Sequence, residues 1–510
     1  MDSVAVLLDR ITETLQEDRA ALRRLKSRIA ATEGAPLIRN DALLNRYRAD
    51  VAAGLRETNA RLERILTLNK IRSQSGIATI TVITEPYPCP GRCVYCPTEA
   101  HAPKSYLTNE PAVRRAVRND YDPFQQMRSR IEALQETGHP TDKIELIIKG
   151  GTWSFYPDSY QREFIQRCLD AANGMPSLSL RMAQQLNEVT DNRVIGVTIE
   201  TRPDYVTPQE ISRLLELGVT RVEIGVQTLE DAVLDLIVRD HGTAAVRQAT
   251  KWLKDAGFKV AYHLMPNLPG ATPDTDLETM RQLFAGPDYQ PDTLKLYPCV
   301  VVETAELYQW WREGRYTPYD DETLAELLCR MKLLVPPHVR IERIIRDIPS
   351  TSIRAGCMLT NLREEVQRRL RARGAACRCI RCRQVRDDAR GEFRLMRRDY
   401  EASGGRELFL SFEDASTDRL AALLRLRIMG GHGMVRELHT YGQHLRLRRH
   451  SEEAAQHQGF GHRLLEEAER IARDEFRCAR MLVIAGVGVR AYYRKFGYEL
   501  SDTYMAKALA

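Results

Sequence analysis

Six apolar, strand-like runs alternate with helix-like stretches between residues 76 and 300, and this alternation restricts the fold more than any other feature of the chain. Alternating β and α units lead to a parallel sheet with right-handed crossovers. We therefore predict an α/β fold, a partial (β/α)6 barrel, with its reactive groups at the carboxyl ends of the strands. The runs are Ile77–Ile83, Lys143–Lys149, Arg193–Glu200, Thr220–Val226, Lys259–Pro266 and Thr293–Cys299.

A loop with three cysteines directly follows the first run. Cys89, Cys93 and Cys96 have the spacing C-x3-C-x2-C. Three thiolates on one short loop can hold three irons of a [4Fe–4S] cluster and leave the fourth iron open. An open iron can bind the amine and carboxylate of S-adenosylmethionine, so the loop predicts radical S-adenosylmethionine (radical SAM) chemistry. The alternative is a structural zinc loop, but such sites usually have four protein ligands.

Polar residues at the ends of later runs are candidates for binding the rest of this cofactor. Glycines after the second run would let backbone carbonyls approach the α-amino group closely, although a simple turn is the alternative. The predicted cofactor-binding residues here are Gly150, Gly151, Thr152, Glu200, Arg202 and Gln227. Lys149, His263 and Lys295 are predicted catalytic residues, and a purely structural strand-end role is the alternative for each.

A second group of cysteines has the pattern C-x-C-x2-C and predicts a structural zinc site that lacks one ligand. Three free thiols on a basic loop are the alternative. The predicted ligands are Cys377, Cys379 and Cys382, with Cys299 as fourth ligand and His338 or Cys357 in reserve. A zinc ion here would hold the surrounding loop against the barrel.

Positive charge is concentrated around this second cysteine group. Between Arg363 and Asp399 there are thirteen Arg and six Asp or Glu, a net charge of +7 in a chain whose total is +6. Such a segment predicts a polyanionic partner, and the partner that we expect is nucleic acid. A solvated helix face is the alternative. The basic helical residues 1–72 are predicted to form an RNA-binding arm or a lid.

The C-terminal residues indicate an α+β domain that binds acyl-coenzyme A. Strand-like runs Glu407–Glu413, Leu420–Ile428, Met434–Tyr441 and Arg480–Val487 flank a helix at 460–473. The helix opens with a Q-x-x-G-x-G turn, whose free N–H groups can bind a pyrophosphate. The predicted coenzyme A ligands are Gln456, Gln458, Gly459, Gly461 and Tyr493, and Tyr492 and Tyr493 are predicted catalytic residues near the sulfur. These elements are typical of GNAT acetyltransferases; packing of the last helix is the alternative for the tyrosines.

With 510 residues, the chain is long enough for about three domains. We predict a helical arm at 1–72, the barrel at 73–300, a linker with the zinc segment at 301–404 and the GNAT domain at 405–510. Eleven cysteines without a recognisable signal peptide fit a reducing cytoplasm better than a disulfide framework. No apolar run approaches the length needed to span a membrane.

Taken together, these motifs resemble those of the catalytic subunit of Elongator, the third Elongator protein, in its free-standing prokaryotic form. The resemblance runs from about Arg72 to the C-terminus. It is carried by the segments 72–77, 93–97, 199–205, 223–227, 294–298, 435–439, 456–461 and 492–495. Cys89 and Cys93 have the usual radical SAM gap, whereas eukaryotic members have a longer one. Eukaryotic members also lack most of the C-x-C-x2-C thiols, so the zinc hypothesis rests on this sequence and its prokaryotic relatives.

The resemblance implies a function on transfer RNA. The enzyme would add a carboxymethyl group to C5 of the wobble uridine, using S-adenosylmethionine radical chemistry, with acetyl-CoA as carbon source. Its partner would be the anticodon stem-loop of tRNA; a homodimer is compatible with this, and further subunits are not expected. Alternatives are a protein lysine acetyltransferase with a structural barrel, a non-enzymatic tRNA-binding scaffold, and another radical SAM RNA reaction such as methylthio transfer.

Overall fold

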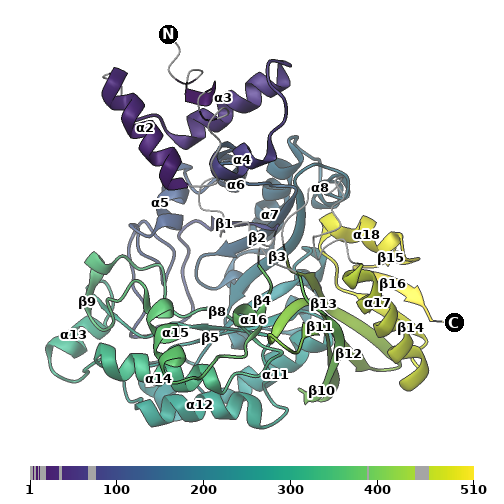
Figure 1. Cartoon of the computed structure of the whole chain (residues 1–510). Coiled ribbons are helices and arrows are strands. Elements are labelled where there is room, and N and C mark those ends of the chain that lie inside the picture. Colours follow the sequence, from purple (N-terminus) through teal and green to yellow (C-terminus); the bar gives the residue numbers. More distant parts are fainter. Residues whose placement is uncertain are drawn as a thin grey trace.

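The computed structural model describes residues 4, 7–9, 11, 19–33, 37–66, 76–386, 390–442 and 459–509. At its centre is a parallel sheet in the order β1-β2-β3-β4-β5-β6-β8, which curves into an open half-barrel (Figure 1). The strands are β1 Ala78–Ile83, β2 Lys143–Lys149, β3 Arg193–Thr201, β4 Arg221–Gln227, β5 Lys259–Leu264, β6 Thr293–Leu296 and β8 Arg340–Arg343.

The six predicted barrel strands are confirmed, and the sheet has one strand more than predicted. β8 pairs in parallel with β6 and comes from the segment that the sequence analysis assigned to the linker. Its residues Arg340-Ile341-Glu342-Arg343 contain one apolar side chain, because Arg340, Glu342 and Arg343 line the interior cavity. A strand whose charged side chains face a barrel interior contains no apolar run, so it is not recognised as a strand from the sequence.

Helices cover the outer face of the half-barrel and enclose its hydrophobic core. Several of these helices begin at a residue whose side chain caps the first turn. Asp122, for example, accepts a hydrogen bond from the Gln125 N–H at the first turn of α6. The covering helices are α6 Pro123–Glu136, α7 Asp158–Asn173, α8 Leu180–Asn187, α9 Pro208–Glu216, α11 Thr243–Asp255 and α12 Pro273–Ala285. Two further helices lie at the cavity: α5 Pro111–Arg118 contributes lining residues, and α10 Asp231–Leu236 packs with the cysteine loop. Short helical turns lie at η2 Trp153–Phe155 and η3 Pro203–Tyr205.

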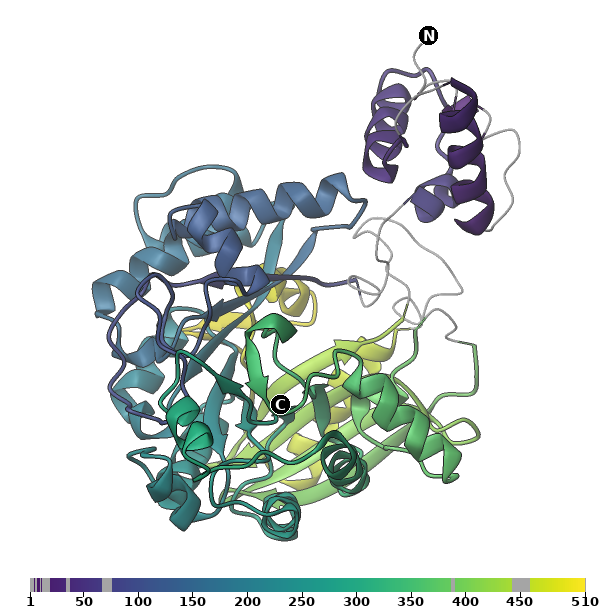
Figure 2. The same ribbon diagram turned by 90° about the vertical axis from the view of Figure 1, so that its left-hand side faces the viewer.

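Two smaller parts of the chain adjoin the barrel: the N-terminal helices and the segment that leads from the barrel to the C-terminal domain. The N-terminal helices α2 Arg19–Glu33, α3 Asn40–Ala52 and α4 Ala60–Leu66 stand apart from the body in Figure 2. They share a small core of their own and contact α6, where Arg48 Nη1 donates to the Gln135 carbonyl at 2.7 Å. Between barrel and C-terminal domain lie β7 Val301–Val302, α13 Leu307–Arg312, α14 Asp321–Leu333, η4 Ser350–Ser352, β9 Ile353–Ala355, α15 Leu362–Ala372 and α16 Ile380–Arg383.

The C-terminal domain is a second, mostly antiparallel seven-stranded sheet. The four predicted strands and the helix are confirmed; β10, β15 and β16 were not predicted. The order β10-β11-β12-β13-β14-β16-β15 comprises β10 Arg394–Ala402, β11 Gly405–Asp414, β12 Arg419–Met429, β13 His432–Thr440, β14 Arg480–Val483, β15 Glu499–Ser501 and β16 Tyr504–Ala508. The helices are α17 Phe460–Arg470, the π-turn η6 Ile471–Glu475, η7 Val487–Val489 and α18 Arg490–Arg494.

A buried network of charges joins this sheet to the barrel. Asp292 accepts hydrogen bonds from Arg436 Nη1 at 2.9 Å and Nη2 at 2.6 Å, and Glu407 accepts from Arg436 Nη2 at 3.0 Å. All three side chains have no solvent exposure. Buried charges are tolerated when paired and hydrogen-bonded, so the network fixes how the two domains face each other. No helix in the described part of the chain is long and apolar enough to cross a membrane.

Candidate active site

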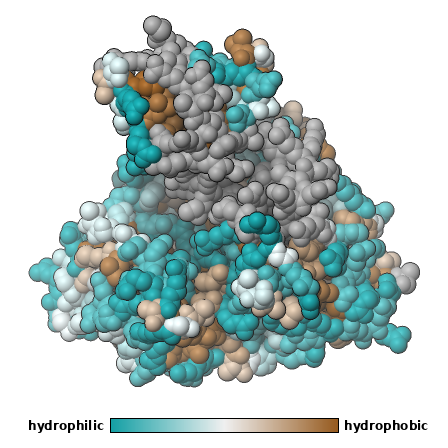
Figure 3. All heavy atoms as spheres, viewed as in Figure 1, coloured by the Kyte–Doolittle hydropathy of each residue, from teal (hydrophilic) through white to brown (hydrophobic). Residues whose placement is uncertain are grey.

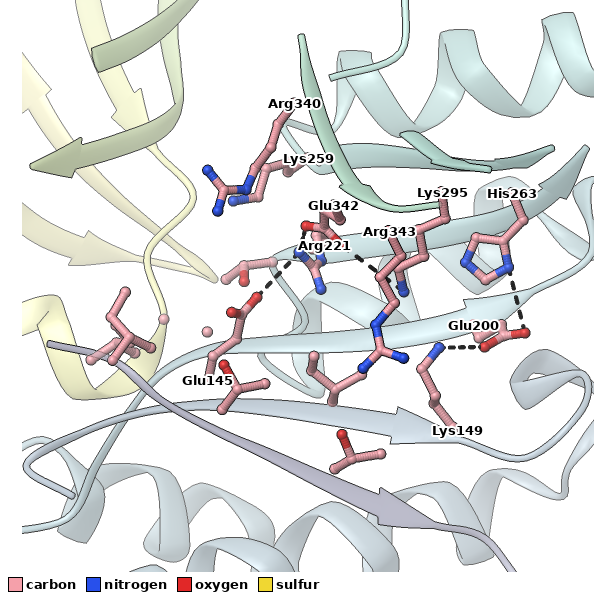
Figure 4. Close-up of a pocket in the computed structure, with 18 of the residues that line it drawn as sticks. Glu145, Lys149, Glu200, Arg221, Lys259, His263, Lys295, Arg340, Glu342 and Arg343 are labelled. Carbon is pink, nitrogen blue, oxygen red and sulfur yellow. Dashed lines mark hydrogen bonds and ion pairs between the residues drawn. The ribbon is translucent and has the colours of Figure 1, made fainter. Parts of the chain in front are cut away.

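One cavity of about 1220 Å³ runs through the half-barrel and reaches the C-terminal domain. At one end it is lined by Cys89, Cys93 and Cys96, and at the other by Gly461 and Tyr492. Between them the strands contribute mostly polar side chains, several of which are drawn in Figure 4. The barrel interior is therefore an open passage rather than the packed core of a full (β/α)8 barrel.

The cysteine loop is held in a defined shape at the mouth of the barrel. The Cys96 N–H donates to the Cys93 carbonyl at 3.1 Å, and the Val94 N–H donates to the Ile237 carbonyl at 3.1 Å. A hydrogen bond with Cys96, aided by the charge of Arg239, lowers the pKa of Cys93 to about 5. The three sulfur atoms do not all lie within 4.8 Å of one another. Three thiols on one loop that do not close around a single point fit a cluster of several irons better than a single ion.

Arg239 is a site residue that the sequence analysis did not identify. Its Nη1 lies 3.4 Å from the Cys93 sulfur, and its Nη2 donates to the Gly225 carbonyl at 2.6 Å. Arg202, which was predicted, donates through Nη2 to the Arg239 carbonyl at 2.9 Å. The sequence around Arg239 contains no recognisable motif. Arg239 reaches the cysteine loop only because the folded chain turns back beneath that loop.

The predicted glycine pair closes β2 beside the cysteines. Gly150 has φ +146°, and a Cβ there would lie 1.7 Å from the Thr84 hydroxyl oxygen, so only glycine fits. Gly151 and Thr152 line the cavity, and the Thr152 hydroxyl oxygen lies 3.6 Å from the Cys89 sulfur. Gln227 also lines the cavity, with an unusual φ of 72°. Of the predicted S-adenosylmethionine ligands, Gly151, Thr152, Glu200, Arg202 and Gln227 line the same cavity as the cysteine loop.

The three predicted catalytic strand-end residues meet around buried carboxylates. His263 Nε2 is 2.9 Å and Lys149 Nζ 3.1 Å from Glu223 Oε2, and Lys295 also contacts this oxygen. Lys149 lies 2.7 Å from Glu200 Oε2 as well, and Lys149, His263 and Glu200 converge in Figure 4.

The charges of this group are balanced internally. Burial alone would raise the pKa of Glu223, but the ammonium groups of Lys149 and Lys295 hold it well below its usual range. Burial lowers the pKa of Lys295 to about 8. Glu200, Glu223 and His263 lie close enough to hold a cation. Because two lysines already neutralise the carboxylates, we interpret the group as an ion-pair cluster.

The far end of the cavity has the features expected of a coenzyme A turn. Gly459 caps α17 in the left-handed conformation, with φ 69°. A Cβ on Gly461 would lie 3.0 Å from the Tyr492 hydroxyl oxygen, and Tyr493 lines the cavity beside it. β13 pairs with β14 only as far as Val435, so its later residues leave an open strand edge. Gln456 and Gln458 lie outside the described residues.

The second cysteine group is compact, but its predicted fourth ligand is wrong. Cys377, Cys379 and Cys382 have sulfur atoms within 4.8 Å of one another, a donor set that suits zinc. Cys299 does not belong to this group; it packs beside Val94 and Tyr316. The reserves do not join it either, since Cys357 packs in the barrel core and His338 stacks on Tyr400 at 4.2 Å. Cys299 follows the end of the sixth barrel strand, but this position does not bring it close to the three thiols.

The arginine-rich segment is only partly available to a partner. Several of its arginines pair with carboxylates, including Arg369 with Glu322 and Arg373 with Glu326. Arg381, by contrast, lines the cavity, where Glu342 attracts it electrostatically, and no salt bridge with a carboxylate is seen for it within the described ranges. The cavity as a whole is cationic, with sixteen Lys or Arg and seven Asp or Glu among its lining residues. The described face in Figure 3 is largely hydrophilic.

The cysteine loop at the mouth of an open parallel half-barrel defines a radical SAM protein. Residues 87–283 match the Radical SAM superfamily, and residues 291–372 match the Radical SAM C-terminal domain. The chain is 48% identical to the tRNA uridine(34) acetyltransferase of Dehalococcoides mccartyi, over 86% of this chain and 99% of that protein. Human Elongator complex protein 3 is 42% identical, over 87% and 86% of the two chains.

A solved structure of Elp3 from Methanocaldococcus infernus, lacking residues 1–46, superposes with a TM-score of 0.76. It is 42% identical and covers 85% of this chain and 100% of that chain. The chain therefore belongs to the family of the tRNA uridine(34) acetyltransferases and Elongator complex protein 3.

Proposed function

We propose that this chain is a tRNA-modifying enzyme that forms a carboxymethyl group at C5 of the wobble uridine, with S-adenosylmethionine and acetyl-CoA as co-substrates. The observation that carries the proposal is a cavity that is lined both by the cysteine loop and by the predicted coenzyme A turn. A radical generator and an acyl carrier must act on the same carbon, so their sites need a shared, water-restricted space.

The cofactor side of this space is assigned to the first half of the barrel. Cys89, Cys93 and Cys96 would hold the [4Fe–4S] cluster, and Gly151 and Thr152 would border the S-adenosylmethionine site. When bound, the reduced cluster and S-adenosylmethionine supply an organic radical, which is the cofactor's own chemistry. The chain's residues bind and orient the reactants and exclude water.

Acetyl-CoA is assigned to the C-terminal end of the cavity. α17 begins after Gly459, which lines the cavity, and the free N–H groups of a helix N-terminus favour a pyrophosphate. The open edge of β13 after Val435 offers unpaired backbone groups to the amides of the pantetheine arm. The Tyr492 hydroxyl group, close to Gly461, would lie beside the thioester.

The nucleic acid is assigned to the cationic opening between the two domains. Arg340 points from the barrel toward the C-terminal domain in Figure 4, as does Lys259, which pairs with Glu437 at 2.7 Å. Arg381 lines the same cavity. Single-stranded RNA loops are recognised through unstacked bases and backbone phosphates, so an anticodon loop fits this charge. A basic peptide, the substrate of a histone-type acetyltransferase, would be repelled by the same surplus of cations.

Two further assignments complete the proposal. Cys377, Cys379 and Cys382 would hold a structural zinc ion that stabilises the loop carrying Arg381. All eleven cysteines are unpaired, which fits a cytoplasmic enzyme.

One experiment tests the function directly. Anaerobically reconstituted protein is incubated with tRNA, acetyl-CoA and S-adenosylmethionine, and digested nucleosides are analysed by mass spectrometry. We expect 5-carboxymethyluridine from the wild type and none from C96A, which should retain tRNA binding. No product from wild-type protein with an intact cluster and bound tRNA would contradict the proposal.

A further inference from the structure

Two arginines are buried against one sulfur of the cysteine loop. Arg239 is 6% exposed, and its Nη1 lies 3.4 Å from the Cys93 sulfur. Arg202 is 4% exposed and packs on the same loop. A Cβ on Gly91 would lie 2.1 Å from Arg202 Nη1 and 3.6 Å from the Cys93 sulfur, so both guanidinium groups approach this thiol.

Two of these donors have no acceptor: Arg239 Nε is buried without a partner among the described residues, and so is one guanidinium nitrogen of Arg202. Arg202 uses Nε and Nη2 for Asp204, at 3.0 and 2.9 Å, and its Nη1 is buried without a partner among the described residues. Leaving a charged donor unpaired in a buried place costs free energy, so such an atom indicates a missing acceptor. The sulfur atoms of iron–sulfur clusters accept hydrogen bonds, so a cluster held by the cysteine loop would supply such an acceptor.

The backbone around Arg239 is built to keep this contact. Val238 has φ 55° and Asp240 has φ 61°. A β-branched residue in the left-handed region is strained, and such strain persists where surrounding structure enforces it. The turn is tied to the cysteine loop itself, because the Ile237 carbonyl accepts from the Val94 N–H.

We infer that Arg239 and Arg202 set the reduction potential of the cluster by placing two buried positive charges and hydrogen-bond donors on the Cys93 side. Reduction adds one negative charge to the cluster, and nearby buried cations stabilise the more negative form. Both arginines therefore raise the potential and make the cluster easier to reduce. The inference rests on the cluster assigned under the proposed function and is independent of tRNA and acetyl-CoA.

The test is the midpoint potential of the reconstituted holoprotein, measured by redox titration with electron paramagnetic resonance. In R239Q we expect the ratio of reduced to oxidised cluster to fall at least tenfold at a fixed solution potential. For a one-electron couple this equals a decrease in midpoint potential of about 59 mV. R202Q should shift the potential in the same direction. R239K, which keeps a charge but loses the planar fork, should shift it less than R239Q.

Arg92 supplies the matched control on the same loop. Its side chain is 81% exposed, so solvent screens its charge and R92Q should keep the wild-type potential. Wild-type potentials in R239Q and R202Q at full iron content would overturn the inference. If R239Q does not retain iron, the midpoint potentials of R202Q and R239K test the inference instead: lowered values support it and wild-type values overturn it. Loss of iron in all three would also overturn it, because the arginines would then only hold the loop. None of these outcomes bears on whether the wild type makes carboxymethyluridine.

Discussion

Gly461 lies directly beside the hydroxyl group of Tyr492: a Cβ on the glycine would be 3.0 Å from that oxygen. A larger side chain must displace the tyrosine or fill the coenzyme A end of the cavity. We expect G461V to weaken acetyl-CoA binding at least about tenfold in calorimetry, a loss of about 1.4 kcal/mol. S-adenosylmethionine binding should be unchanged. G286A is the matched control, because nothing lies within 4 Å of a Cβ there.

Arg381 tests the cationic opening. R381Q should weaken tRNA binding and reduce the slope of log affinity against log salt by about 1, as for one lost phosphate contact. Fluorescence anisotropy over a salt series measures both. R373Q is the control, since Arg373 already pairs with Glu326. Equal slopes for R381Q and the wild type would contradict the assignment of Arg381 to the RNA site.

Asp276 predicts a pH-dependent stability change. Burial raises the pKa of Asp276 from 3.8 to about 6. A carboxyl with a raised pKa in the folded state contributes stability at low pH that is lost as the pH rises through 6. D276N keeps an oxygen for the Asn267 N–H without this ionisation. Thermal melts should show D276N stabilised relative to wild type at pH 8, with the difference shrinking toward pH 4. A constant difference would contradict this.

The parts of this molecule that could be predicted are those encoded locally. Barrel strands are recognisable because one face is buried and apolar, as Ile144, Leu146 and Ile148 are in β2, and the cysteine loop is recognisable because its cysteines are near neighbours in sequence. β8 was missed because Glu342 and Arg343 face the cavity. Arg239 and the true surroundings of Cys299 depend on contacts between distant segments, which spacing along the chain does not record.

Arg436 tests the buried junction between the domains. Its removal leaves Asp292 and Glu407 with fewer partners in a place without solvent. Breaking a buried, hydrogen-bonded charge network costs about 3–5 kcal/mol. R436Q should therefore lower the midpoint of chemical unfolding clearly, whereas R473Q, which removes an exposed pair with Asp474, should change it by less than about 1 kcal/mol. Similar midpoints for both variants would show that the network does not hold the domains.

The thiol group of Cys379 tests the zinc assignment. Cys379 lies within 4.8 Å of Cys377 and Cys382, so C379S should remove a ligand and lower the zinc content from one ion per chain to nearly none. Cys299 lies elsewhere, in the cluster with Val94 and Tyr316, so C299S should retain zinc. Elemental analysis of zinc and iron on the same samples separates the two sites, because C379S should keep the iron of the first cysteine loop. Zinc retained in C379S and lost in C299S would reverse the assignment and restore Cys299 as a ligand.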